Sequence, residues 1–188
     1  MKIEELRIIL QMKLTPKRYK HSLGVRDTAV ILAKRFGGSI EKAEVAGLMH
    51  DCAREFSEDK LLKMADQFNI GIGKIERESP VLLHAYVGAV LAETIYGIHD
   101  VEIKQAIRTH TTGGRNMSLL DKIIYLADVI EPSRNFPGVE NLRALAEVDL
   151  NLAVMTALDQ SILHIIQEKG LIHPDTILAR NEFLLKDA

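Results

Sequence analysis

The sequence predicts an all-α protein in which about eight to ten helices form a single bundle. Apolar residues recur at three- and four-residue spacing along the chain, and no segment keeps the alternating pattern of a half-buried strand. Neither Asn-Gly nor Asp-Gly, the commonest hairpin dipeptides, occurs. A chain of 188 residues suits one domain and buries a sizeable core without disulfides.

The helices of the first half are delimited by cap residues and glycines. Thr15-Pro16 combines an N-cap with a proline at the first helical position, and Gly37-Gly38 ends that helix. Ser79-Pro80 repeats the same start signal. With their caps, the predicted helices are Ile3–Leu10, Thr15–Gly37, Ser39–His50, Ser57 to before Gly71, and Ser79–Gly97.

The second half continues in the same way, but two of its loops carry unusual residues. The predicted helices run over Asp100–His110, Ser118–Glu131 and Asp149–Gly170, with a last short helix after Pro174. The segments Thr109–Asn116 and Pro132–Gly138 combine glycine, proline, arginine and hydroxyl residues. We therefore expect both loops to do more than connect helices.

Composition excludes several classes of function. Lys and Arg number 24 against 26 Asp and Glu, so the chain lacks the basic excess of proteins that bind nucleic-acid phosphates. A single cysteine, Cys52, allows neither an internal disulfide nor a thiolate metal cage, which fits a cytoplasmic protein. No stretch approaches the roughly 20 apolar residues of a membrane span. We expect neither a nucleic-acid partner nor a membrane.

Six residues suggest one metal site. They are His21, His50, Asp51, His84, His110 and Asp128. Successive groups lie 29, 33, 26 and 18 residues apart, so all except the adjacent pair come from different helices. A helical bundle can direct such side chains into one interior site. Each residue alone has a simpler interpretation: His21 as a half-buried structural histidine, His50-Asp51 as a helix end, Asp128 as part of an exposed stripe with Asp121.

The residue types favour a catalytic metal. Four imidazoles and two carboxylates form a mixed nitrogen and oxygen donor set, so iron, manganese or zinc fit better than a zinc finger or a calcium loop. Two divalent ions with two aspartates would leave the site positively charged, which suits a phosphate substrate. Asp51, if it bridges the ions, has a reason to end an apolar helix.

The motifs around these residues resemble a known family. The pattern of a histidine, a His-Asp pair, two further histidines and an aspartate is similar to the HD-domain superfamily of metal-dependent phosphohydrolases. The local sequence resembles its bacterial YqeK-type branch over roughly residues 15–185. The segments that carry this resemblance are Arg18–Val25, His50–Glu55, Thr109–Gly113, Leu119–Asp128 and Glu131–Val139.

The resemblance implies an activity and a division of ligands. Members of the branch are symmetrical diadenosine tetraphosphate hydrolases with a di-iron centre, and they produce two ADP. His21, His50, Asp51 and Asp128 would hold one ion, and His84 and His110 the second, with Asp51 bridging. Manganese or zinc could replace iron, and a homodimer is an option. The fold is then one HD-type domain over 1–188, with a metal-site core at about 15–135 completed by helices within 141–186.

Further residues are expected to act on the substrate. Beside the catalytic candidates Asp51, His84 and His110, Arg54 stands three positions after Asp51, where many HD proteins have lysine. Expected substrate contacts are Arg18, His84, His110, Thr111, Arg134 and His173. Arginines suit this role because they bind phosphate oxygens through a forked pair of hydrogen bonds. His99 and His164 have no partner in the pattern.

Three other functions stay open at this level. The first is a nucleotidase of the same superfamily that acts on mononucleotides, and the second is a regulatory module that binds nucleotides without cleaving them. A di-iron oxygenase on the same scaffold is the third. A complete set of six ligands argues against an idle regulatory site. Neither a Walker phosphate loop nor a Rossmann glycine motif is present.

Overall fold

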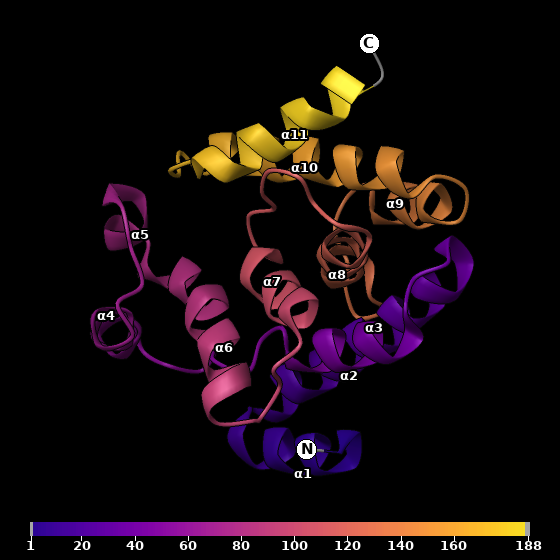
Figure 1. The fold of residues 1–188 in the computed structure, drawn as a ribbon. Helices are drawn as coiled ribbons and strands as arrows, with labels where there is room; N and C mark the ends of the chain where they lie inside the picture. Colours follow the sequence, from indigo (N-terminus) through magenta and orange to yellow (C-terminus); the bar gives the residue numbers. More distant parts are fainter. Residues whose placement is uncertain (1, 187–188) are drawn as a thin grey trace.

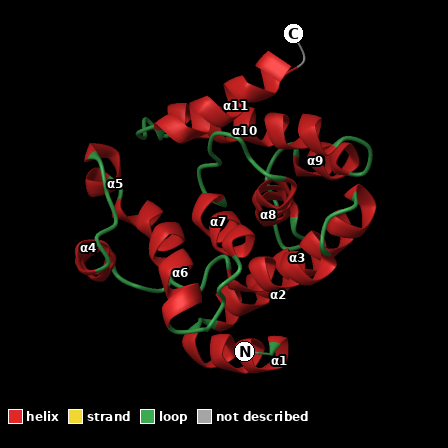
Figure 2. Ribbon diagram, viewed as in Figure 1, coloured by secondary structure: helices red, strands yellow, loops and turns green. Residues whose placement is uncertain are grey.

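The computed structural model describes residues 2–186, and within this range the chain is helical, with no strand (Figure 2). This confirms the predicted all-α class. The elements are α1 (Ile3–Lys13), α2 (Pro16–Phe36), α3 (Ile40–Met49), α4 (Glu58–Gln67), α5 (Lys74–Glu78), a 3₁₀ turn (Pro80–Leu82), α6 (Leu83–Thr94), α7 (Val101–Thr109), α8 (Leu119–Ile130), α9 (Val139–Ala146), α10 (Leu150–Gln167) and α11 (Pro174–Lys186).

Most helices begin where their cap residues predicted. The side chain of Thr15 accepts a hydrogen bond from the backbone N–H of Arg18, directly ahead of Pro16. Ser39, Ser57, Asp100, Ser118 and Asp149 cap α3, α4, α7, α8 and α10 in the same way. Each cap satisfies a backbone donor that the first helical turn leaves without a partner.

Four details differ from the prediction. Ser79 caps no helix, because Pro80 begins a 3₁₀ turn and α6 starts only at Leu83. The same helix ends at Thr94, before Gly97. The short helices α5 and α9 were not predicted, since 5 and 8 residues are too few to show a clear apolar period. The last helix, expected to be short, runs for 13 residues.

Helix α8 forms the centre of the bundle. Figure 1 shows α2, α3 and α7 packed around it and α10 crossing it on the side of the C-terminus. Its residues Ile123–Ala127 are all buried. A helix that is apolar on nearly all sides is the expected centre of a bundle. Asp128, one residue beyond this segment, is thereby carried to the middle of the fold.

Helices α2 and α3 approach closely at Gly47. A Cβ atom built on Gly47 would lie 2.9 Å from the Cα of Arg26, so only glycine fits there without a shift of backbone. This close packing brings His21 on α2 within reach of His50 at the end of α3. Cys52 is buried, and burial raises the pKa of its thiol to about 12, as expected for an inert structural cysteine. In the part of the chain that is described, no helix is both long and apolar enough to span a bilayer.

Candidate metal centre

The six residues singled out in the sequence lie together inside the bundle. His21 comes from α2, His84 from α6 and Asp128 from α8, whereas His50-Asp51 and His110 directly follow α3 and α7. All are buried except Asp128, which is partly exposed. Three triads among them have donor atoms within 4.8 Å of one another: His21, His50 and Asp51; His50, His110 and Asp128; Asp51, His84 and His110.

Hydrogen bonds orient three of the four imidazoles in the same way. The Nδ1 of His50 lies 2.8 Å from the carbonyl oxygen of Gly47, and the Nδ1 of His110 lies 2.7 Å from that of Ile107. His84 makes the corresponding contact with Val81. Because a carbonyl only accepts, each Nδ1 must carry the proton. In a neutral ring with its proton on Nδ1, the Nε2 atom is the acceptor, and this is the form that ligates metals.

These acceptor atoms face one another. The Nε2 atoms of His21 and His50 are 3.2 Å apart, and those of His84 and His110 are 3.1 Å apart. When both nitrogens of such a pair carry lone pairs, they repel each other unless a cation lies between or beside them. The donor set therefore fits divalent metal ions in two respects: its residue types are common metal ligands, and its facing Nε2 atoms are best accommodated by a cation.

Asp51 contacts both pairs of imidazoles. Its Oδ1 lies 3.2 Å from Nε2 of His84 and 3.6 Å from Nε2 of His110. Its Oδ2 lies 3.4 Å from Nε2 of His50 and 3.8 Å from Nε2 of His21. Burial by itself would raise the pKa of Asp51, but the surrounding imidazoles, His50 first, hold it well below its usual range. A carboxylate with one oxygen toward each pair is placed to bridge two ions.

Asp128 is bound on two sides. Its Oδ1 lies 3.0 Å from Nε2 of His21 and also accepts a hydrogen bond from the guanidinium of Arg134. The Nε of Arg134 in addition donates to the backbone oxygen of Asp128 at 2.7 Å. Burial opposes ionisation, but the contact with His21 and nearby positive charges lower the pKa of Asp128. Arg134, expected to contact substrate, thus also orients this carboxylate.

Glu131 was not among the predicted site residues. It is buried, and its Oε1 lies 3.0 Å from Nδ1 of His21. The backbone N–H of Ser133 donates to its Oε2 at 2.8 Å, and the Ser133 hydroxyl donates to its Oε1. A carboxylate behind a ligating imidazole fixes the ring and increases its basicity. Its position three residues after Asp128, at the end of the same apolar helix, was the signal available in the sequence.

A cleft of about 410 Å³ opens beside this centre, here named the phosphate cleft. It is lined by Thr15, Lys17, Arg18, His21, Glu55, Glu131, Ser133, Arg134, Asn135 and Phe136. Nη1 of Arg18 donates to Oδ2 of Asp51 at 2.7 Å, so this cation links the cleft to the ligand cluster. Three basic side chains and several hydroxyl and amide groups suit a phosphate chain.

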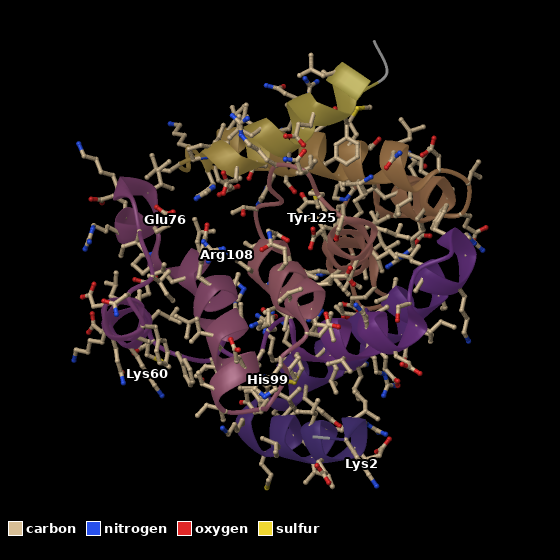
Figure 3. All side chains as sticks on the ribbon, in the orientation of Figure 1. Lys2, Lys60, Glu76, His99, Arg108 and Tyr125 are labelled. Carbon is tan, nitrogen blue, oxygen red and sulfur yellow. The ribbon has the colours of Figure 1, made fainter. Side chains whose placement is uncertain are left out.

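The remaining predicted residues lie in different surroundings. The hydroxyl of Thr111 is 3.1 Å from Nε2 of His110 and 3.4 Å from Nε2 of His84, at the edge of the cluster. Nε2 of His173 pairs with Glu76 at 3.1 Å, and His173 belongs to none of the three ligand triads; Figure 3 marks Glu76 on α5. Arg54 is half-buried; its backbone N–H donates to the carbonyl oxygen of Asp51 at 2.9 Å, but its guanidinium has no hydrogen bond or ion pair among residues 2–186.

Comparison with known proteins places these features in a family. Residues 18–133 match the HD domain family. The chain is 42% identical to a protein of Halalkalibacterium halodurans over 178 residues, 95% of each chain, and 39% identical to one of Bacillus subtilis with the same coverage. A protein of Staphylococcus aureus is 34% identical over 100% of this chain and 97% of its own. All three are named "Bis(5'-nucleosyl)-tetraphosphatase, symmetrical".

A crystal structure shows the same fold. A protein from Clostridium acetobutylicum, described as a predicted HD superfamily hydrolase involved in NAD metabolism, superposes with a TM-score of 0.96. It is 42% identical, and the match covers 99% of this chain and 98% of the other.

Proposed function

The chain belongs to the HD domain family, and on that premise we propose that it is a metal-dependent hydrolase that cleaves diadenosine tetraphosphate symmetrically to two ADP. The reaction breaks a phosphoanhydride bond with water. Iron as the metal, two ions as the stoichiometry, a cytoplasmic location and a homodimer belong to the same proposal.

The geometry of Asp51 carries the assignment of a two-metal centre. Its two carboxylate oxygens face two separate imidazole pairs, His21 with His50 and His84 with His110. Two-metal sites of this kind stabilise both the attacking and the leaving oxygen of a phosphoryl transfer. A single structural ion would need only one of the pairs.

In this proposal, different residues bind the metal ions, the non-reacting phosphates and the reacting phosphoryl group. The six ligands hold the metal ions, which when bound lower the pKa of a ligating water and neutralise charge on the phosphoryl group. Lys17 and Arg18 line the cleft where non-reacting phosphates would lie. The Thr111 hydroxyl, beside His84 and His110, is positioned to donate to a phosphoryl oxygen. Arg54, three residues after Asp51 and with a guanidinium that is unpaired within the described residues, would be a further cation for the leaving ADP.

Product analysis on anaerobically purified, metal-loaded protein tests the proposal. Early in the reaction with diadenosine tetraphosphate, ion-exchange chromatography should give a single ADP peak. Equal amounts of ATP and AMP would contradict symmetric cleavage. Release of phosphate from mononucleotides, with diadenosine tetraphosphate intact, would favour the nucleotidase instead. A chelator should abolish turnover, readdition of iron, manganese or zinc should identify the active metal, and oxygen uptake without bond cleavage would indicate an oxygenase.

A further inference from the structure

A second hollow adjoins the phosphate cleft. It lies between α8, the loop 132–138 and α10, and its volume is about 570 Å³. We refer to it as the α8–α10 hollow. Its lining includes Phe136, Gln160, Leu163, His164 and Gln167. This volume falls in the ordinary range of sites for small ligands.

Two side chains separate the hollow from the phosphate cleft. Arg134 and Phe136 line both spaces, so the two meet along the loop 132–138. Arg134 also contacts the predicted ligand Asp128. A molecule with its phosphates beside the cluster can therefore extend past Arg134 and place its other end in the hollow.

The lining suits a flat heterocycle. Phe136 offers an aromatic face, and Leu163 and Val129 add apolar surface. Aromatic side chains stack on nucleic-acid bases of any type, and this contact is energetically substantial. Gln160, His164 and Gln167 supply hydrogen-bonding groups from successive turns of α10. An apolar slot with a few polar groups at its edge matches the two faces and the polar edge of a base.

Gln160 narrows the choice of base. Its amide oxygen is buried and has no hydrogen-bond partner among the described residues. Its amide nitrogen packs against Gly138, where a Cβ atom would lie only 3.0 Å away. A buried polar atom without a partner is uncommon in a native fold. Once turned toward the hollow, the glutamine amide is complementary to adenine, because it accepts from the 6-amino group and donates to N7.

We propose that the α8–α10 hollow binds the adenine of the substrate half whose phosphates occupy the phosphate cleft, with Gln160 as the group that selects adenine over guanine. This inference rests on the proposed function for the identity of the substrate. It adds the site of the base and a specificity residue, neither of which belongs to the ligand cluster.

Binding of ADP to the metal-loaded protein, measured by titration calorimetry, tests the site without relying on turnover. Leu163→Trp should fill the hollow and weaken ADP binding by about tenfold or more, while binding of pyrophosphate stays unchanged. The control is Leu152→Trp, which changes an exposed leucine of the same helix that does not line the hollow. Equal ADP affinity of the Leu163→Trp variant and the wild type would overturn the proposal.

Base selectivity tests Gln160 separately. The wild type should bind ADP about tenfold more tightly than GDP, and Gln160→Leu should remove this preference while circular dichroism and metal content stay unchanged. An unaltered preference in the variant, or none in the wild type, would exclude Gln160 as the selecting group. Failure of the wild type to cleave diadenosine tetraphosphate would instead count against the proposed function, because ADP binding is scored independently of hydrolysis.

Discussion

His21 is held between two carboxylates, since its Nδ1 lies 3.0 Å from Oε1 of Glu131 while its Nε2 lies 3.0 Å from Oδ1 of Asp128. Burial alone would lower the pKa of His21, but these contacts outweigh it and raise the pKa. A Cβ atom on Gly24 would lie 2.5 Å from Oε2 of Glu131, so α2 is shaped to admit the buried carboxylate.

Changing Glu131 should therefore weaken metal binding without unfolding the protein. Glu131→Gln keeps the size of the side chain but removes the charge that supports His21. Mutating a residue that hydrogen-bonds to a metal ligand typically lowers metal affinity or activity by about 10–100-fold. Competition with a chromophoric chelator measures the change, and Glu168→Gln, on the exposed end of α10, is the control. Equal affinities in the two variants would show that Glu131 has only a structural role.

Asp51→Asn should lose both ions and turnover. The carboxylate contacts both imidazole pairs, so its neutral amide weakens both sites at once. The loss of metal affinity should be at least as large as the roughly 10–100-fold loss expected when a residue that supports a metal ligand is mutated. Metal content by plasma mass spectrometry checks this, with Asp66→Asn on the exposed face of α4 as the control. Retention of one tightly bound ion would argue against bridging.

His84→Ala and His110→Ala should each reduce the stoichiometry toward one ion. These imidazoles lie near Oδ1 of Asp51, whereas His50 lies near Oδ2, and the loss of either leaves the donors around Oδ2 in place. Metal per chain, measured at increasing free metal concentration, separates the two sites. If either variant loses both ions together, the division of ligands given by the family resemblance does not hold here.

Gly47→Ala should destabilise the fold and with it the cluster. The added methyl group would meet the backbone of α2 at Arg26, which cannot yield as a side chain does. Overpacking of this kind costs about 1–3 kcal/mol. Denaturant unfolding should show this loss, whereas Gly71→Ala, at an exposed position with open space around it, should change stability little. Similar midpoints for the two variants would contradict the close approach of α2 and α3.

The Glu76–His173 pair should contribute stability that is lost in acid. Burial opposes the charge of Glu76, but the hydrogen bond with His173 outweighs it and lowers the pKa. A carboxyl whose folded pKa is depressed stabilises the fold fully above its unfolded value, near 4.3, and less as the pH falls through the folded pKa. Glu76→Gln should therefore cost up to about 1 kcal/mol at neutral pH, because solvent screens a partly exposed pair and the amide oxygen of glutamine can still accept from His173.

Thermal unfolding at several pH values measures this difference. The melting temperatures of the wild type and Glu76→Gln should differ at pH 7 and approach each other as the pH falls from about 4.3 through the lower folded pKa of Glu76. Glu78→Gln, an exposed acid of the same helix, is the control. A difference that stays constant through the acid range would assign the effect to packing and not to the charge of Glu76.

The sequence by itself determined the helices and the membership of the cluster. Caps such as Ser39 and Ser118 bind the backbone N–H three residues further on, so their effect is local and can be predicted from the sequence. The ligand set was visible because its members, the adjacent His50 and Asp51 apart, belong to different helices or helix ends at intervals that a bundle can fold together. The short helices α5 and α9 were not predicted, because an apolar period can be recognised only over more residues than they contain.

Only the tertiary structure decided which partners these residues meet. Nothing in the local sequence places Glu131 behind His21, 110 residues away, or pairs His173 with Glu76 instead of the cluster. Such contacts depend on how far one helix slides and turns against another, and that is set by the fit of the whole core, including Gly47 against Arg26. The two carboxylate oxygens of Asp51 likewise acquire separate imidazole pairs only when α2, α3, α6 and α7 are packed together.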